Sequence, residues 1–236
     1  MTQFSNRKRL IGLTAAALIA GTALTGVLNA APSAELSAQQ AEAAIAKGKA
    51  SKAIAFAEQA VTNEPTNPRY RAVLGSAYLS AGRFMSAASA FEDATALGDN
   101  SPRTILSLAL AQTGSNQTTL ALASLDRANE SIAPADLGLA YALAGDPQRG
   151  VAILSDAIRN GENTSKIRQN LAYALALMGD WRQSRVMASM DIPEEQVGDR
   201  MQEWANMAQS GAFQHRVAAL LNVPVINQDA GRPAAL

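Results

Sequence analysis

The sequence of 236 residues contains no cysteine. This absence excludes disulfide bridges, cysteine-ligated zinc, a thiol nucleophile and the lipid-carrying cysteine of a bacterial lipoprotein. The single histidine, His215, is too few for a multi-histidine metal site. We therefore expect neither a metal nor another cofactor.

Aromatic residues are also scarce, at 5% of the chain, although 48% of the residues are hydrophobic. Alanine supplies much of that apolar share, and alanine-rich chains with few aromatic residues favour closely packed helices over sheets. The formal net charge is zero. A chain without excess positive charge has no general attraction for nucleic acid or for anionic membrane surfaces, so we expect neither as a partner.

Catalytic motifs are missing as well. The sequence has no glycine-rich phosphate loop after a strand, no His-Glu-x-x-His zinc motif and no Gly-x-Ser-x-Gly nucleophile elbow. Acidic pairs such as Glu194-Glu195 are typical of a solvated helix face. We predict that the protein is not an enzyme.

The N-terminus begins with the basic cluster Arg7-Lys8-Arg9, followed by an uncharged stretch over residues 10–28 and by small residues up to Ser33. This order is typical of a Sec-type signal peptide, which we place at residues 1–30 with cleavage after Ala30. It predicts a periplasmic or secreted protein. The alternative is an uncleaved inner-membrane anchor, because the uncharged stretch could nearly span a bilayer.

The clearest pattern lies between Pro68 and Ala94 and predicts two short helices joined at Gly82. Small residues stand where two helices must approach closely, and large residues stand where the gaps must be filled. The small residues are Gly75, Ala87 and Ala94, and the large ones are Leu74, Tyr78, Phe84 and Phe91.

A glycine at the expected helix end recurs along the chain at nearly regular intervals. Glycine suits this position because the left-handed conformation that ends many helices costs it no steric strain. Prolines fall at or between the unit boundaries, where they can start a helix. The five glycines are Gly48, Gly82, Gly114, Gly145 and Gly179.

This arrangement resembles tetratricopeptide repeat proteins from Ala34 to about Met190. The resemblance implies an all-α fold: a right-handed α-solenoid of about five stacked, antiparallel helix pairs with a concave groove, here at residues 31–191. It also implies binding of another protein rather than catalysis. The layout of the whole chain, from export signal through repeats to a tryptophan-containing end, is similar to the tetratricopeptide component of Flp-type (tight-adherence) pilus assembly systems.

Two further helices are predicted at residues 192–222. In the first of them Val197, Met201 and Trp204 form an apolar stripe. We expect this pair to cap the solenoid by covering its last repeat. Residues 223–236, with two prolines and a glycine, are predicted to form a flexible tail.

The resemblance implies that the first helix of each repeat lines the groove. These positions hold mostly apolar residues and would suit an amphipathic helix or an apolar peptide of a partner protein. The alternative is that the superhelix is tight and these side chains contact one another. The predicted groove residues are Arg69, Leu79, Leu108, Gln112, Leu139, Leu143, Lys166, Gln169, Tyr173 and Leu177.

Together these features predict a non-catalytic protein-interaction scaffold of the bacterial cell envelope that helps to assemble a pilus or secretion apparatus. One alternative is a periplasmic adaptor or chaperone-like repeat protein unrelated to pili. Another is a carrier subunit of an envelope enzyme.

Overall fold

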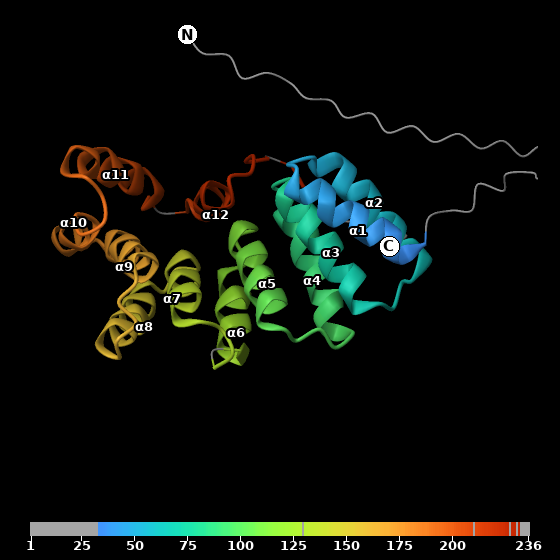
Figure 1. Ribbon diagram of the computed structural model, residues 1–236, viewed down its shortest axis with the longest axis horizontal. Helices are drawn as coiled ribbons and strands as arrows, with labels where there is room; N and C mark the ends of the chain where they lie inside the picture. The colour runs from blue at the N-terminus through green and yellow to red at the C-terminus, as the bar shows by residue number, and fades with distance from the viewer. Residues whose placement is uncertain (1–32, 129, 210, 227, 230, 232–236) are drawn as a thin grey trace, which may run out of the picture. The chain divides into compact units, whose positions relative to one another are not determined.

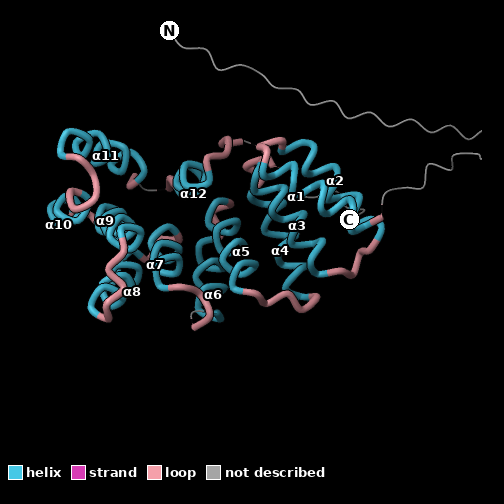
Figure 2. The backbone as a smooth tube through the Cα atoms, in the orientation of Figure 1, coloured by secondary structure: helices cyan, strands magenta, loops and turns pink. Residues whose placement is uncertain are grey.

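The computed structural model describes residues 33–231 except 129, 210, 227 and 230 (Figure 1). The predicted signal peptide and the last five residues of the predicted tail lie outside this range. The described residues form helices and connecting loops without strands (Figure 2), which confirms the all-α prediction. None of the described helices combines the length and apolarity needed to cross a membrane.

The described part of the chain contains twelve helices. In chain order they are α1 (Ala34–Ala46), α2 (Ala50–Asn63), α3 (Pro68–Ser80), α4 (Phe84–Ala96), α5 (Pro102–Gly114), α6 (Thr118–Ala128), α7 (Pro134–Leu143), α8 (Pro147–Arg159), α9 (Ser165–Met178), α10 (Trp181–Ala188), α11 (Glu194–Met207) and α12 (Phe213–Leu221).

The first ten helices form five pairs, and the two helices of each pair pack against each other. Each odd-numbered helix also packs against the next odd-numbered one, from α1 through α3, α5 and α7 to α9. Neighbouring pairs therefore stack in chain order, as Figure 1 shows. This is the predicted α-solenoid of helix pairs.

Local sequence signals start these helices. The side chains of Asn67, Ser101 and Thr164 accept hydrogen bonds from backbone N–H groups in the first turns of α3, α5 and α9. Prolines occupy the beginning of α3, α5, α7 and α8, where the missing N–H costs no helical hydrogen bond. The predicted repeat boundaries therefore have a physical basis.

The core between paired helices matches the predicted division into small and large residues. Tyr78, Phe84 and Phe91 are at most 2% exposed. A Cβ added at Gly75 would lie 2.8 Å from the ring of Phe91, which is closer than real Cβ contacts allow. Gly75 therefore sets how closely α3 approaches α4.

The structure corrects the repeat spacing at one point. Gly48, Gly82, Gly145 and Gly179 adopt positive φ values, as predicted, whereas Gly114 belongs to α5 as its last residue. The left-handed residue of this repeat is Asn116, with a φ of 64°. Asparagine is the residue besides glycine that tolerates this conformation best.

Asn116 follows Gly82 at the same spacing at which Gly82 follows Gly48. The third repeat therefore has the regular length, and its register shifts by two residues relative to the sequence prediction. Gly114 is small for a different reason. A Cβ there would lie 2.6 Å from Cγ of Phe84. Two glycine roles, turn formation and close packing, look identical in the sequence.

Replacement of Asn116 tests the corrected register. We expect Asn116→Ala to lower the free energy of unfolding by about 1 kcal/mol, because alanine tolerates a positive φ poorly. Asn116→Gly should leave it unchanged or raise it, since glycine adopts this conformation without strain. Denaturant unfolding measures both, and equal stability of the alanine variant and the wild type would contradict a left-handed turn at this residue.

The C-terminal helices differ from the predicted cap. Helix α11 packs on α9 and α10 and so covers the last repeat, as expected of a cap. Helix α12 instead packs on α5 and α7. The chain can turn back between them because Gly211 takes a φ of 77° in the connection.

The predicted tail makes specific contacts with the rest of the chain at several of its described residues, rather than being free throughout. Gln214 on α12 donates a hydrogen bond of 2.8 Å to the carbonyl oxygen of Ile226. The Asp229 carboxylate accepts hydrogen bonds from the backbone N–H and the hydroxyl of Ser86, at 2.8 and 2.5 Å. Ser86 is in the first turn of α4, where unpaired N–H groups attract an anion. The tail thus supplies a cap for a distant helix.

Candidate functional site: the inner cleft of α1, α3 and α5

With the corrected register, Glu35, Arg69 and Arg103 occupy equivalent positions of three consecutive inner helices, each one repeat length after the last. The Arg69 guanidinium pairs with Glu35 at 2.5 Å and with Glu42 at 3.2 Å, so it joins α3 to α1. Arg103 is exposed, and no carboxylate within the described residues forms an ion pair with it. Among the described residues of the first three repeats, the inner face therefore presents Arg69 with carboxylate partners and Arg103 without one.

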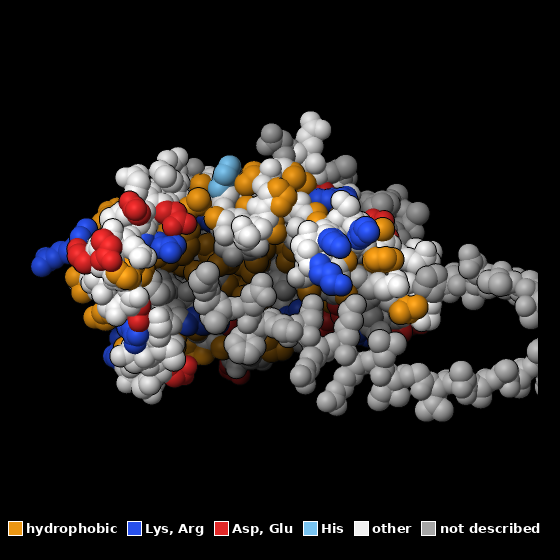
Figure 3. All heavy atoms as spheres, turned by 45° about the horizontal axis from the view of Figure 1, so that its top comes forward, with side chains coloured by type: hydrophobic (Ala, Val, Ile, Leu, Met, Phe, Trp, Pro, Cys, Tyr) orange, Lys and Arg blue, Asp and Glu red, His pale blue; other side chains and the backbone are white. Residues whose placement is uncertain are grey.

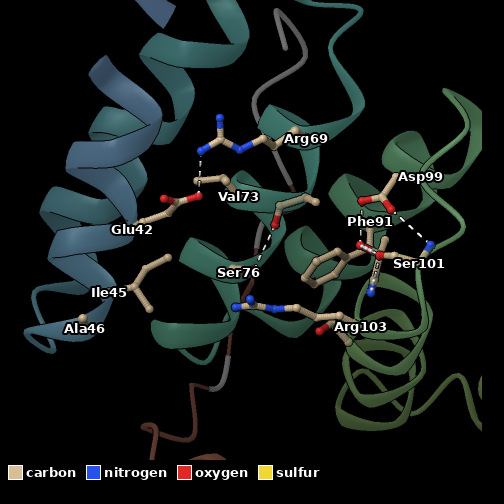
Figure 4. A pocket seen from close by; sticks show the side chains of 13 residues that line it. Glu42, Ile45, Ala46, Arg69, Val73, Ser76, Phe91, Asp99, Ser101 and Arg103 are labelled. Carbon is tan, nitrogen blue, oxygen red and sulfur yellow. Dashed lines mark hydrogen bonds and ion pairs between the residues drawn. The ribbon is translucent and has the colours of Figure 1, made fainter. Parts of the chain in front are cut away.

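Glu42, Arg69 and Arg103 line a cleft of about 550 Å³ between α1, α3 and α5 (Figure 4). Its lining consists of inner-face residues of the first three repeats, joined by Phe91 of α4 and the loop before α5. The lining residues are Glu42, Ile45, Ala46, Arg69, Ala72, Val73, Ser76, Phe91, Asp99, Ser101, Arg103, Thr104 and Ser107.

The cleft has both apolar and polar walls, and the charged side chains of Glu42, Arg69 and Arg103 are part of its lining. Val73 and Phe91 are at most 7% exposed and provide apolar walls. In Figure 4 the Arg103 side chain extends from α5 toward Ser76 of α3, while Arg69 faces Glu42 across the other side. Such a cleft can accept a short apolar side chain and bind a carboxylate at Arg103.

Hydrogen bonds lower the pKa of two carboxylates in and beside the cleft, Asp99 and Glu35. The hydrogen bonds from Gln39 and then from Arg69 lower the pKa of Glu35 below its usual value. Partial burial acts to raise the pKa of Asp99, but hydrogen bonds from Thr104 and Ser101 outweigh it, and the net shift is downward. The described residues contain no cluster of histidine and acidic residues that could hold a metal ion. The arrangement supports binding by charge and shape.

Among the predicted groove residues, Arg69 lines this cleft. Gln112 is instead 3% exposed. Its amide donates to Glu92 at 3.1 Å and accepts from the Ser124 hydroxyl at 2.9 Å. Gln112 follows Tyr78 by one repeat length, and Tyr78 likewise donates from its hydroxyl to Glu58 at 2.9 Å. The register shift thus turns a predicted groove residue into a packing residue.

Three predicted groove leucines are also buried. Leu108 follows the core residue Leu74 by one repeat length and, like it, is at most 1% exposed. Leu79 shares its buried cluster with Val217 of α12. Leu143 is fully buried. The apolar strip predicted as an open groove is therefore covered in this part of the array.

The remaining predicted residues belong to the fourth and fifth repeats. Lys166 pairs with Asp136 at 2.7 Å, and Gln169 donates to the carbonyl oxygen of Ala188 at 3.3 Å. The predicted groove residue Tyr173 stacks on Trp204 of α11, with ring centroids 5.4 Å apart. Leu139 and Leu177 are partly buried. These residues lie apart from the N-terminal cleft and contact their own neighbours.

The two tryptophans differ in burial, since Trp204 is 8% exposed and Trp181 is 39% exposed. On the face in Figure 3, apolar side chains surface along the middle of the array, and charged side chains gather toward both ends. The same view shows the exposed His215 of α12.

Arg103, Glu42 and Ile45 line the cleft but were not among the predicted groove residues. Arg103 could have been found from Asn116, the turn-forming residue that follows Gly82 by a full repeat length. A repeat counted from this turn places Arg103 at the position of Arg69. Glu42 and Ile45 could have been found by applying the groove positions to the first repeat, which has the same pattern around Gly48.

Comparison with known proteins agrees with this architecture. A family model described as tetratricopeptide repeat matches residues 44–108. The curated proteins include no match to the sequence.

Several solved structures share the fold. YrrB, described as a tetratricopeptide repeat protein with an unusual peptide-binding site, is 17% identical with a TM-score of 0.54, over 72% of this chain and 92% of its own. MamA from Desulfovibrio magneticus RS-1 is 18% identical with a TM-score of 0.52, over 75% and 97%. PilF from Pseudomonas aeruginosa is 14% identical with a TM-score of 0.52, over 80% and 88%.

Proposed function

Because the described helices have the tetratricopeptide repeat fold, with residues 44–108 matching the repeat itself, we propose that this protein is a non-catalytic scaffold that captures a partner protein. The capture site is the cleft of α1, α3 and α5. The bound element is a short peptide segment that carries an apolar side chain and a carboxylate.

The observation that carries this proposal is the unpaired Arg103 at the edge of an open cleft with apolar walls. Most of the other predicted groove residues are buried or bonded to neighbouring groups. A guanidinium beside a desolvated surface binds a carboxylate through charge-assisted hydrogen bonds. The apolar walls add affinity for a neighbouring side chain, and the opposite charges of Arg69 and Glu42 can fix the direction of the peptide.

The proposed setting is the bacterial cell envelope, and the proposed task is assembly of a pilus or secretion apparatus. Support comes from the signal-like sequence at residues 1–30 and from the similarity of the layout to pilus-assembly repeat components. The fold shared with PilF is compatible with this setting, and the fold shared with YrrB, which has a peptide-binding site, supports capture of a peptide segment. An adaptor unrelated to pili remains the second candidate, since it would use the same cleft.

Site-specific photocrosslinking tests the cleft. A benzophenone amino acid at Ser76, inside the cleft, should capture a partner in intact cells, and mass spectrometry should place the crosslink in one defined segment of it. The same probe at Leu120, which is 50% exposed on α6, serves as the control. Equal capture from both positions would contradict binding in the cleft.

The purified partner then allows a measurement of affinity. We expect Arg103→Glu to weaken binding at least tenfold, because it puts two like charges together at the contact. Arg182→Glu reverses a charge on exposed α10 and should leave the affinity within twofold of the wild type. Unchanged affinity of the Arg103 variant would contradict the proposed contact between Arg103 and a carboxylate of the partner. The identity of the partner decides between a pilus or secretion role and a general adaptor.

A further inference from the structure

The C-terminal segment 213–229, hereafter the strap, lies on the inner face of the array in its described residues, which are 213–226, 228 and 229. Its helix α12 packs on the inner helices α5 and α7. Val217 and Ala218 are at most 2% exposed and share a buried cluster with Leu79 of α3. Leu110 of α5 packs against the same cluster. An amphipathic helix of the chain itself thus occupies the kind of surface on which repeat proteins hold partner helices.

The second half of the strap is bound by polar groups at the turn between α3 and α4. Besides its two hydrogen bonds from Ser86, the Asp229 carboxylate lies 3.4 Å from Nε of Arg83. Arg83 also donates to the carbonyl oxygen of Gly231 at 2.9 Å. At Gly82 a Cβ would come within 2.0 Å of the carbonyl oxygen of Pro224. The surface therefore recognises a helix, an extended stretch and a carboxylate in that order.

The surface under the strap continues from the open cleft. Ser76 of α3 and Ser107 of α5 line the cleft. One helical turn further along the same two helices come Leu79 and Leu110, which belong to or pack against the cluster that holds Val217. A partner segment bound in the cleft and extended along α3 and α5 would reach the strap directly.

Part of the strap is well placed for release. Leu220 of α12 is 44% exposed and Val225 is 39% exposed, so the strap keeps apolar surface in water. Its connection to α11 contains Gly211 at a positive φ, a position from which the backbone can change direction with little steric hindrance.

We propose that the surface beneath the strap is a second docking site, whose external ligand is a partner's amphipathic helix followed by an extended stretch with an acidic residue. The strap is the internal copy of this ligand and keeps the apolar surface covered until a partner replaces it. The site is distinct from the cleft, and its test needs no knowledge of the cleft's partner.

A synthetic, fluorescent peptide of residues 212–231 is the probe, and the full chain is the receptor. We expect weak binding to the wild type, whose site is occupied. Val217→Asp in the receptor should loosen the internal helix, because it buries a charge, and should raise the affinity for the peptide at least tenfold. Leu220→Asp, on the exposed side of α12, is the matched control and should bind the peptide as the wild type does.

The absence of cysteine allows a reversible lock that does not depend on a destabilising substitution. Ser86→Cys combined with Asp229→Cys places two thiols where the wild-type side chains touch at 2.5 Å. The oxidised protein should bind the peptide at least tenfold more weakly than the same protein after reduction.

Equal peptide affinity of the oxidised and reduced double-cysteine protein would overturn the proposal. It would also be overturned if neither the folded Val217→Asp variant nor the reduced double-cysteine protein bound the peptide better than the wild type. Circular dichroism establishes that the variants are folded. Oxidation to a covalent dimer would show that the strap comes from a second copy of the chain, which would also overturn docking of a different protein.

Discussion

Replacing Gly75 with leucine should lower the free energy of unfolding by about 3 kcal/mol or more, because the new side chain has no space between α3 and α4. A Cβ alone would lie 2.8 Å from the ring of Phe91, which is itself 1% exposed and cannot move into solvent without leaving the core. Denaturant unfolding followed by circular dichroism measures the effect.

A second substitution tests whether the loss of stability in Gly75→Leu comes from the contact between residue 75 and Phe91. Phe91→Ala alone should cost about 3 to 5 kcal/mol through the cavity that it leaves. Combined with Gly75→Leu it should cost less than the sum of the two, because leucine fills part of that cavity. Additive losses would show that the two residues do not meet.

Gly198→Ala is the matched control for a glycine in a helix. This residue lies in α11, and a Cβ there would have no atom within 4 Å. Alanine should stabilise the protein by up to about 1 kcal/mol through its higher helix propensity. A loss of stability here would mean that the contrast with Gly75 does not come from packing.

Gly82→Ala should destabilise the protein by more than Gly179→Ala, and it should free the strap. Both glycines have positive φ values, 70° and 90°, so each substitution costs about 1 to 2 kcal/mol of backbone strain. At Gly179 nothing lies within 4 Å of a new Cβ, whereas at Gly82 the Pro224 carbonyl oxygen would be 2.0 Å away. The loss of stability in Gly82→Ala beyond that in Gly179→Ala therefore measures the contact between Gly82 and the strap.

Limited proteolysis gives the second measurement for this pair. The strap of the Gly82→Ala variant should be cut at least tenfold faster than that of the Gly179→Ala variant, since cleavage follows the population of the open state. Equal losses of stability together with equal cleavage rates would show that the strap does not depend on its contact at Gly82.

The inner face of this array is divided among three uses. The first three repeats leave a cleft with charged edges open, the middle is covered by the strap, and the last repeat contacts α11. A repeat protein whose groove is partly filled by its own chain needs no separate partner to keep apolar surface from water. The open cleft then offers a partner its first contact.

The sequence by itself determined the helix pairs and most of their boundaries. Small residues at close approaches, large residues in the gaps, prolines at helix starts and glycines at left-handed turns act within one repeat or between neighbouring repeats. Local rules suffice for such features, because each repeat contacts little beyond its neighbours. Tyr78, predicted as a large residue that fills a gap between helices, is fully buried, and Tyr141 at the same repeat position is fully buried as well.

The candidate site was less accessible from the sequence. Arg69 was identified, but the choice of Gly114 as a turn residue displaced the register of α5 by two residues and hid Arg103. A glycine that permits close packing and a glycine that permits a turn give the same letter. The two roles are separated by the short distance that a Cβ added at Gly114 would have to Phe84 and by the positive φ of Asn116.

Only the tertiary structure decided where the strap lies. Its contacts join Asp229 to Ser86 and α12 to α5, between residues far apart in the chain. The apolar face of α12 could equally have covered the last repeat, because amphipathicity says that a helix must bury one face and does not say against what. Gly211 lets the chain reverse, and the inner surface of α3 and α5 lies within its reach.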